Sequence, residues 1–195
     1  MKVVYIHGFQ SSSKAKKAQI LDEVISKNYP DISFEAPDFP DNIKLALSVL
    51  EKKVESWLEE DESVCLVGSS MGGFLSILLS IKYPVKIALI NPCLNPQDFC
   101  IENKLVGQKL KNPDTQNEFV ITDADVEYMT QKSLLMSSYS KNMTKVYLQT
   151  GDTVLDYTIA RDFFTDCPVS IEEGGCHGYD NFDRIVPDII DFFKV

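Results

Sequence analysis

Short apolar runs alternate along the chain with amphipathic patterns, and this alternation predicts the architecture. The runs are rich in valine and isoleucine, as expected for strands that are buried on both faces of a parallel sheet. Six strands are predicted, at Lys2–Ile6, Ile32–Ala36, Ser63–Val67, Lys86–Ile90, Lys145–Gln149 and Val169–Glu172. Helical spacing predicts helices near Lys14–Asn28, Asn42–Glu59, Met71–Tyr83, Leu155–Asp166 and Pro187–Phe193. We therefore expect an α/β protein whose parallel sheet carries helices on both faces.

The segment from about 92 to 143 interrupts this rhythm, because it is far longer than a normal connection in an α/β unit. It contains an extended piece at Glu118–Ile121 and a helix at about Asp123–Leu135, for which Thr122 or Asp123 is the expected N-cap. The segment leaves the carboxyl end of the fourth predicted strand, where ligands bind in open α/β sheets. We expect it to form a cap over the site, and the alternative is an insertion packed beside the sheet.

Composition and charge narrow the class of protein. With 44% apolar and 25% charged residues, the chain is typical of a soluble globular protein, and we expect residues 1–195 to form one domain. The formal charge of −10 argues against nucleic-acid or anionic-lipid partners, and no apolar run is long enough to span a bilayer. No signal-like segment precedes the first strand, and the five cysteines are irregularly spaced. We expect a cytoplasmic protein with reduced thiols, and its oligomeric state stays open.

The most specific motif is Gly68-Ser69-Ser70-Met71-Gly72, which lies between a predicted strand and a predicted helix. A G-x-S-x-G sequence in this setting is typical of the nucleophile elbow of α/β-hydrolases, a sharp turn that exposes the serine Oγ above the sheet. Ser70 is therefore the candidate nucleophile. The alternative is a structural turn whose serine has no chemical role.

A serine hydroxyl needs a base, and the chain has only two histidines, His7 and His177. In α/β-hydrolases the order along the chain is serine, acid, histidine, so His177 is the predicted base. The acid should follow the strand that ends at Gln149, where Asp152 leaves the turn directly. Asp156 lies one helical turn further on and is the alternative acid, although it is also well placed to start a helix.

The loop after the first strand, His7-Gly8-Phe9-Gln10, lies where this fold places one donor of the oxyanion hole. We expect the backbone N–H groups of Phe9 and Met71 to be these donors, and His7 to brace the loop. Cys176 stands beside His177, but neighbours in sequence rarely face each other, so a cysteine nucleophile is not expected. No cluster has metal-ligand spacing and no glycine pattern matches a nucleotide loop, so neither a metal nor a cofactor is predicted.

The chain resembles the YqiA-type esterase family, which comprises small bacterial α/β-hydrolases. The resemblance spans nearly the whole length and rests on five motifs: Tyr5–Ser12 with Lys17-Ala18, Val67–Gly73, Asn91-Pro92, Gln149–Tyr157 and Glu173–His177. It implies a triad of Ser70, Asp152 and His177, in agreement with the assignment from the residues. It also implies esterase activity on acyl esters or thioesters without a cofactor. Similar proteins carry Asn-Pro-Tyr-Thr-Gly where this chain has Asn112–Gln116.

Together these features predict a serine esterase or thioesterase that acts on a small-molecule acyl ester through an acyl-enzyme on Ser70. Two alternatives stay open. One is a binding protein that kept the fold without the activity, and the other is an acyltransferase or lactone hydrolase with the same triad.

Overall fold

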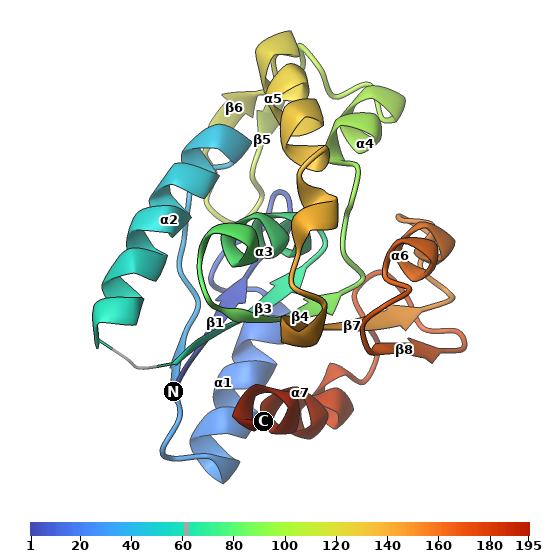
Figure 1. Ribbon diagram of the computed structural model, residues 1–195. Helices are drawn as coiled ribbons and strands as arrows, with labels where there is room; N and C mark the ends of the chain where they lie inside the picture. Colours follow the sequence, from blue (N-terminus) through green and yellow to red (C-terminus); the bar gives the residue numbers. More distant parts are fainter. Residues whose placement is uncertain (61–62) are drawn as a thin grey trace.

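The computed structural model describes residues 1–60 and 63–195, and at its centre lies a six-stranded parallel sheet (Figure 1). The strands are β1 (Lys2–Ile6), β2 (Ser33–Glu35), β3 (Val64–Ser69), β4 (Lys86–Ile90), β7 (Thr144–Gln149) and β8 (Val169–Glu172). Their order across the sheet is β2-β1-β3-β4-β7-β8, and every neighbouring pair is parallel. All six carboxyl ends therefore meet at one edge, where the loops that carry the candidate residues come together.

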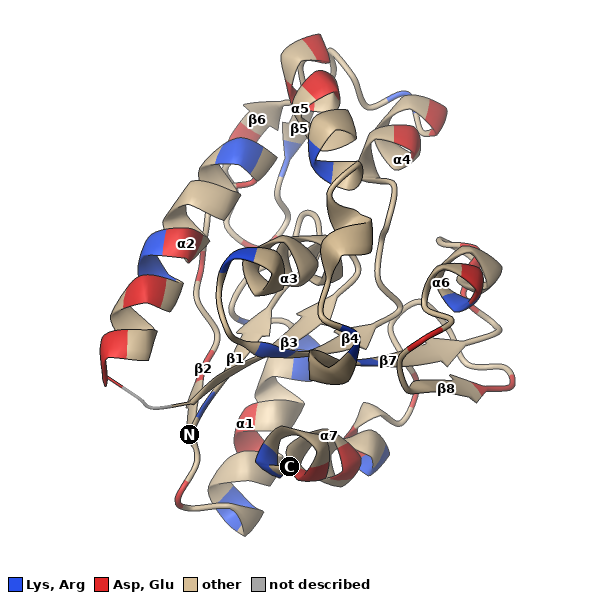
Figure 2. Cartoon of the chain, in the orientation of Figure 1, with Lys and Arg blue, Asp and Glu red and all other residues tan. Residues whose placement is uncertain are grey.

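Helices cover both faces of the sheet (Figure 1). The helices on one face are α1 (Lys16–Asn28) and α7 (Val186–Lys194), and those on the other are α2 (Ile43–Glu60), α3 (Met71–Lys82) and α6 (Tyr157–Phe163). Alternation along β1 explains the two layers, because Val3 and Tyr5 join the core under α1 and α7 while Val4 and Ile6 join the opposite core. The positions of charged residues fall mainly on helices and connections and leave the middle of the sheet uncharged (Figure 2).

The segment between β4 and β7 has more structure than its sequence predicted. It contains α4 (Pro96–Glu102), a hairpin of β5 (Lys109–Lys111) and β6 (Glu118–Val120), α5 (Asp123–Ser133) and the 3-10 turns η1 (Met136–Ser138) and η2 (Lys141–Met143). Thr122 caps α5, since its Oγ1 accepts from the Asp125 N–H and the Asp125 carboxylate accepts in return. The extended piece and the α5 helix were predicted, but α4 and β5 were missed because they are short and polar.

The turn of the β5–β6 hairpin is fastened to the sheet edge by Asn112, whose side chain is buried. Its Nδ2 donates to the Ser11 carbonyl at 3.0 Å and to Asp41 Oδ1 at 2.7 Å. Ser12 Oγ donates to Asp114 Oδ2 at 2.9 Å beside it. The segment between β4 and β7 is thus held against the loop that follows β1.

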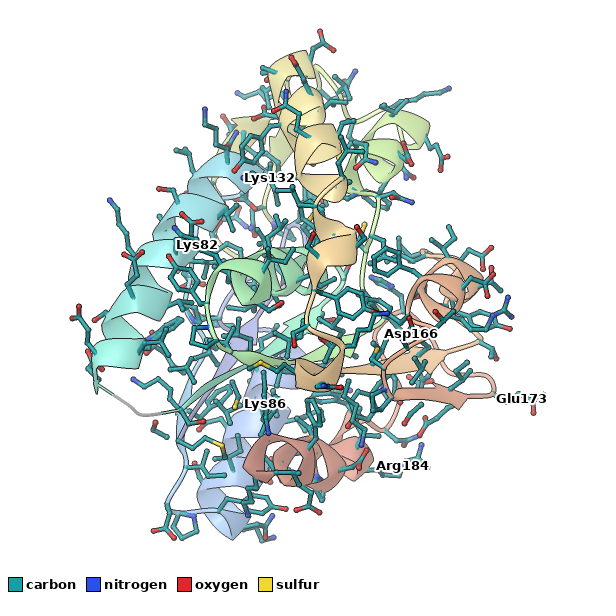
Figure 3. The ribbon with its side chains drawn as sticks, viewed as in Figure 1. Lys82, Lys86, Lys132, Asp166, Glu173 and Arg184 are labelled. Carbon is teal, nitrogen blue, oxygen red and sulfur yellow. The ribbon has the colours of Figure 1, made fainter. Side chains whose placement is uncertain are left out.

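Several predicted boundaries differ from the structure by one to three residues, and two of the differences have clear physical reasons. β3 runs on to Ser69, because its backbone keeps its register with β4 until the elbow. Helix α6 begins at Tyr157 rather than Leu155, because Asp156 caps it by accepting from the Thr158 N–H at 2.9 Å. The exposed acids Asp166 and Glu173 lie at the periphery of the molecule (Figure 3).

Candidate active site

Ser70 occupies a sharp turn between β3 and α3. Its φ of 54° and ψ of −121° lie in a region that L-residues rarely adopt and that costs about 1–3 kcal/mol. The turn is held by backbone bonds, because the Ser70 N–H donates to the Ile90 carbonyl at 3.1 Å and its carbonyl accepts from Cys93 at 3.0 Å. The predicted elbow is therefore present, and Ser70 sits at its strained position.

The backbone around Ser70 is packed so closely that its glycines leave no room for a side chain. A Cβ on Gly72 would lie 2.0 Å from the Ile6 carbonyl oxygen, and one on Gly68 would lie 2.4 Å from Ser76 Oγ. A Cβ on Gly8 would lie 3.3 Å from the Cβ of Ser70, so the loop after β1 passes directly beside the serine. The elbow can therefore form only where the crossing backbone segments carry no side chain.

His177 and Asp152 form a hydrogen-bonded pair at the carboxyl ends of β8 and β7. The imidazole Nδ1–H donates to Asp152 Oδ2 at 2.7 Å. The Asp152 side chain is 2% exposed and that of His177 is 26% exposed. Asp152 Oδ1 accepts from the backbone N–H groups of Val154 and Leu155, each at 2.9 Å. The carboxylate is thus fixed from both sides, and Nε2 of the ring is the nitrogen free to exchange a proton.

Hydrogen bonding outweighs burial in setting the charge of Asp152. Burial works to raise the pKa of this carboxyl, but the bonds from His177 and from the Leu155 and Val154 amides hold the pKa below its ordinary value. The side chain is therefore a carboxylate at neutral pH. A carboxylate in this position orients the imidazole and stabilises its charged form.

The alternative acid, Asp156, is placed elsewhere. Its Oδ1 accepts from the Thr158 N–H and hydroxyl at 2.9 and 2.7 Å, which makes it the cap of α6. These bonds, led by the one from the Thr158 side chain, hold the pKa of Asp156 below its ordinary value. The two aspartates therefore have different partners: Asp152 is bonded to His177, and Asp156 caps the start of α6.

The loop that carries His177 is anchored by two buried carboxamides that the sequence interpretation did not assign. Gln149 Oε1 accepts from the backbone N–H groups of Cys176 and Asp180, at 3.1 and 2.8 Å. Asn91 Nδ2 donates to the carbonyls of Cys176 and His177, at 3.1 and 3.2 Å. Asn91 Oδ1 also accepts from the Gln149 N–H at 3.0 Å. The sequence offered one signal for these roles: a polar residue stands at the carboxyl end of each of two strands, Asn91 after β4 and Gln149 in β7.

Phe9 and Met71, whose amides were the expected oxyanion donors, both line the pocket beside Ser70. Within the part of the chain that the structure describes, neither backbone N–H donates to another residue. The Phe9 ring makes edge-to-face contacts with Phe99 and Phe119, at centroid distances of 6.2 and 5.8 Å.

His7 is buried at the start of the loop that carries Phe9. Its ring stacks on Phe39 with centroids 3.9 Å apart, and its Nδ1 pairs with the Gly8 carbonyl at 3.0 Å. Burial lowers the pKa of the imidazole, so the ring is neutral. These contacts agree with the predicted bracing role for His7 in the loop after β1.

Two pockets share Ser70, His177 and Phe9 in their linings. The smaller, of about 170 Å³, is mainly apolar, and its other walls are Met71, Cys93, Phe99, Val154 and Leu155. The larger, of about 700 Å³, is the more polar of the two, and its lining includes the loop from Cys176 to Asp183, Lys16 and Lys17. Lys17 Nζ donates to the Gly178 carbonyl at 2.9 Å, which ties α1 to the histidine loop.

The remaining groups have structural explanations. All five cysteines are free thiols, and Cys176 Sγ donates to Asp180 Oδ1 at 3.1 Å instead of turning toward His177. Across residues 1–60 and 63–195, no three His, Cys, Asp or Glu side chains gather closely enough to hold a metal ion. Over the same ranges, no helix is long and apolar enough to cross a membrane.

Solved structures with this architecture are α/β-hydrolases. Est1E from Butyrivibrio proteoclasticus, solved with ferulic acid, is 14% identical with a TM-score of 0.72, over 98% of this chain and 87% of that one. A monoacylglycerol lipase from Paleococcus ferrophilus is 16% identical with a TM-score of 0.70, over 98% and 94%. Mouse alpha/beta hydrolase domain-containing protein 10 is 17% identical with a TM-score of 0.69, over 99% and 89%. The predicted α/β-hydrolase fold is confirmed.

The sequence motifs and a family comparison agree. A model described as an uncharacterised protein family, UPF0227, matches residues 2–194. This range includes the elbow, the Asp152 turn and the His177 loop. The chain therefore belongs to the protein family UPF0227, the YqiA-like family that its motifs resemble.

Proposed function

We propose that the protein is a serine hydrolase that cleaves carboxylic esters or acyl thioesters through an acyl-enzyme on Ser70. The observation that carries this proposal is the presence at one site of Ser70, in a strained turn, and of His177, whose Nδ1 is bonded to the buried Asp152 carboxylate. Both side chains line the same two pockets. The hydrolase, esterase and lipase names of the structural neighbours give further support.

In the proposed reaction, Ser70 Oγ attacks the acyl carbon while His177 Nε2 takes the hydroxyl proton. The negative oxygen that forms accepts from the Phe9 and Met71 N–H groups. His177 then gives the proton to the leaving alcohol or thiol, and the bond to the acyl carbon breaks. Water, activated by His177, releases the acid and restores Ser70. Asp152 holds the imidazole throughout.

We propose that residues 92–143 act as the cap of this single domain. The segment contributes Cys93 and Phe99 to the apolar pocket and Asp114 to the polar one. Asp114 lies in the stretch that departs from similar proteins, and Gln116, where those carry glycine, has a φ of 65°. The cap therefore shapes both sides of the site.

The test is hydrolysis of p-nitrophenyl butyrate by the wild type and by Ser70→Ala. We expect the variant to lose at least about a thousandfold in kcat while it keeps its folded structure. Full activity in Ser70→Ala would overturn the proposal. The same assay with added alcohol or thiol acceptors distinguishes hydrolysis from acyl transfer, because an acyltransferase would form the new ester or thioester in preference to the acid.

A further inference from the structure

The apolar pocket beside Ser70 adjoins a second space. A groove of about 220 Å³ is lined by residues of α4 and α6, which lie one above the other on the same side of the molecule (Figure 1). The pocket and this groove share four lining residues: Cys93, Phe99, Val154 and Leu155. We refer to the second space as the α4–α6 groove. It leads from the neighbourhood of Ser70 to the surface.

The α4–α6 groove has a mixed lining, in which polar residues such as Asn95 and Asn103 stand beside exposed apolar side chains. Val154 and Ile159 are each 50% exposed, although both are large hydrophobic residues. Burial raises the pKa of the Cys93 thiol to about 12, so this side chain is a neutral lining group. A single exposed apolar residue is ordinary on a protein surface. Two in one groove beside a reactive serine indicate a surface that an apolar part of the substrate covers.

The charges around the site distinguish the acyl side from the leaving-group side. Asp98, Glu102 and Asp156 line the α4–α6 groove, and this rim disfavours a negatively charged leaving group there. The large polar pocket also carries acids, Asp114, Asp180 and Asp183, but it has two cations beside them, Lys16 and Lys17, which the lining of the α4–α6 groove lacks.

The histidine loop supports the same assignment. The leaving group must receive its proton from His177, which lines both pockets, but the rest of its loop, from Gly178 to Asp183, lines the polar pocket and not the apolar one. Phe9 and Met71, which hold the proposed oxyanion donors, line the apolar pocket together. The acyl group therefore belongs on the apolar side.

We propose that the acyl chain of the substrate runs from Ser70 through the apolar pocket into the α4–α6 groove, where Ile159 favours longer chains. This inference rests on the proposed ester hydrolysis at Ser70. The pocket is small, at about 170 Å³. A longer chain must leave it, and Val154 and Ile159 offer that chain apolar contacts in the groove.

The test measures kcat/KM for p-nitrophenyl esters whose acyl group grows from acetyl to decanoyl. In the wild type we expect kcat/KM to keep rising beyond hexanoyl, because each methylene removed from water contributes up to about fourfold. Ile159→Asn should lower the decanoyl-to-butyryl ratio of kcat/KM by about tenfold, because it replaces an apolar side chain of the groove lining by a polar one. The matched control is Ile101→Asn, because Ile101 is 54% exposed on α4 and lines neither space. The control should keep the wild-type ratio.

A second series of alkyl acetates, in which only the alcohol grows, determines which part of the ester uses the groove. The proposal expects no change in the chain-length dependence of this series in Ile159→Asn. It is wrong if Ile159→Asn alters the alcohol series instead, or if its decanoyl-to-butyryl ratio equals that of Ile101→Asn. A wild type that hydrolyses no ester of either series overturns the proposed function itself, and the acyl assignment falls with it.

Discussion

Gly151 passes so close to the histidine loop that its N–H donates to the Gly174 carbonyl at 2.7 Å. A Cβ on Gly151 would lie 2.3 Å from the carbonyl oxygen of Gly175. This contact brings the loops after β7 and β8 together, and it places Asp152 within 2.7 Å of His177 although 25 residues separate them. The hydrogen bond between Asp152 and His177 therefore depends on Gly151, because any side chain at that position would keep the two loops apart.

Asp152→Asn and Asp156→Asn should have very different effects on catalysis. An amide at Asp152 cannot stabilise the imidazolium and favours the wrong tautomer of His177, so we expect kcat to fall about 10³–10⁴-fold. Asp156→Asn removes only the charge of a helix cap, and asparagine caps helices well, so kcat should stay near the wild-type value. Steady-state kinetics on p-nitrophenyl butyrate measure both. Equal losses in the two variants would contradict the assignment.

The Asp152 carboxylate should make stability depend on pH in a defined direction. Its pKa is lower in the folded chain than the ordinary value of 3.8, so the charged form stabilises the fold above that pH. This contribution is lost as the pH falls through the folded pKa. The difference in unfolding free energy between wild type and Asp152→Asn should therefore shrink in acid. Urea denaturation from neutral to acidic pH measures it, and a difference independent of pH would refute the expectation.

Gly72→Ala should destabilise the protein strongly. Its Cβ would overlap the Ile6 carbonyl, which belongs to β1 in the middle of the sheet and cannot move away. We expect a loss of about 3 kcal/mol or more in unfolding free energy. Gly178→Ala is the control, because there the nearest atom to the new Cβ is Cys176 Sγ at 3.4 Å. Equal midpoints of denaturation for the two variants would show that the elbow tolerates a side chain.

Gln149→Leu should lower kcat more than it raises KM. Leucine keeps the volume but leaves the N–H groups of Cys176 and Asp180 without their acceptor. A His177 loop displaced by about 1 Å can cost on the order of 100-fold in rate. Gln131→Leu, on the exposed face of α5, should change neither constant. A rise in KM with unchanged kcat would show that Gln149 supports binding instead of the histidine.

The parts of the fold that could be predicted are those fixed by local pattern. The six strands and the elbow follow from short apolar runs, glycine spacing and the order of Ser70, Asp152 and His177 along the chain. Helix α4 and strand β5 could not be predicted, because seven and three residues are too few to show a period. The roles of Asn91 and Gln149 also stayed hidden, since they depend on contacts between residues 27 to 86 positions apart. Nothing in one sequence shows which loops meet at an edge.

The most direct test of the central claim is labelling with a fluorophosphonate, followed by mass spectrometry of the modified peptide. We predict stoichiometric modification of Ser70 in the wild type, none in Ser70→Ala, and a rate lowered at least about a hundredfold in His177→Ala. A folded wild type that shows no labelling, or a label on another serine, would contradict the claim that Ser70 is the activated nucleophile.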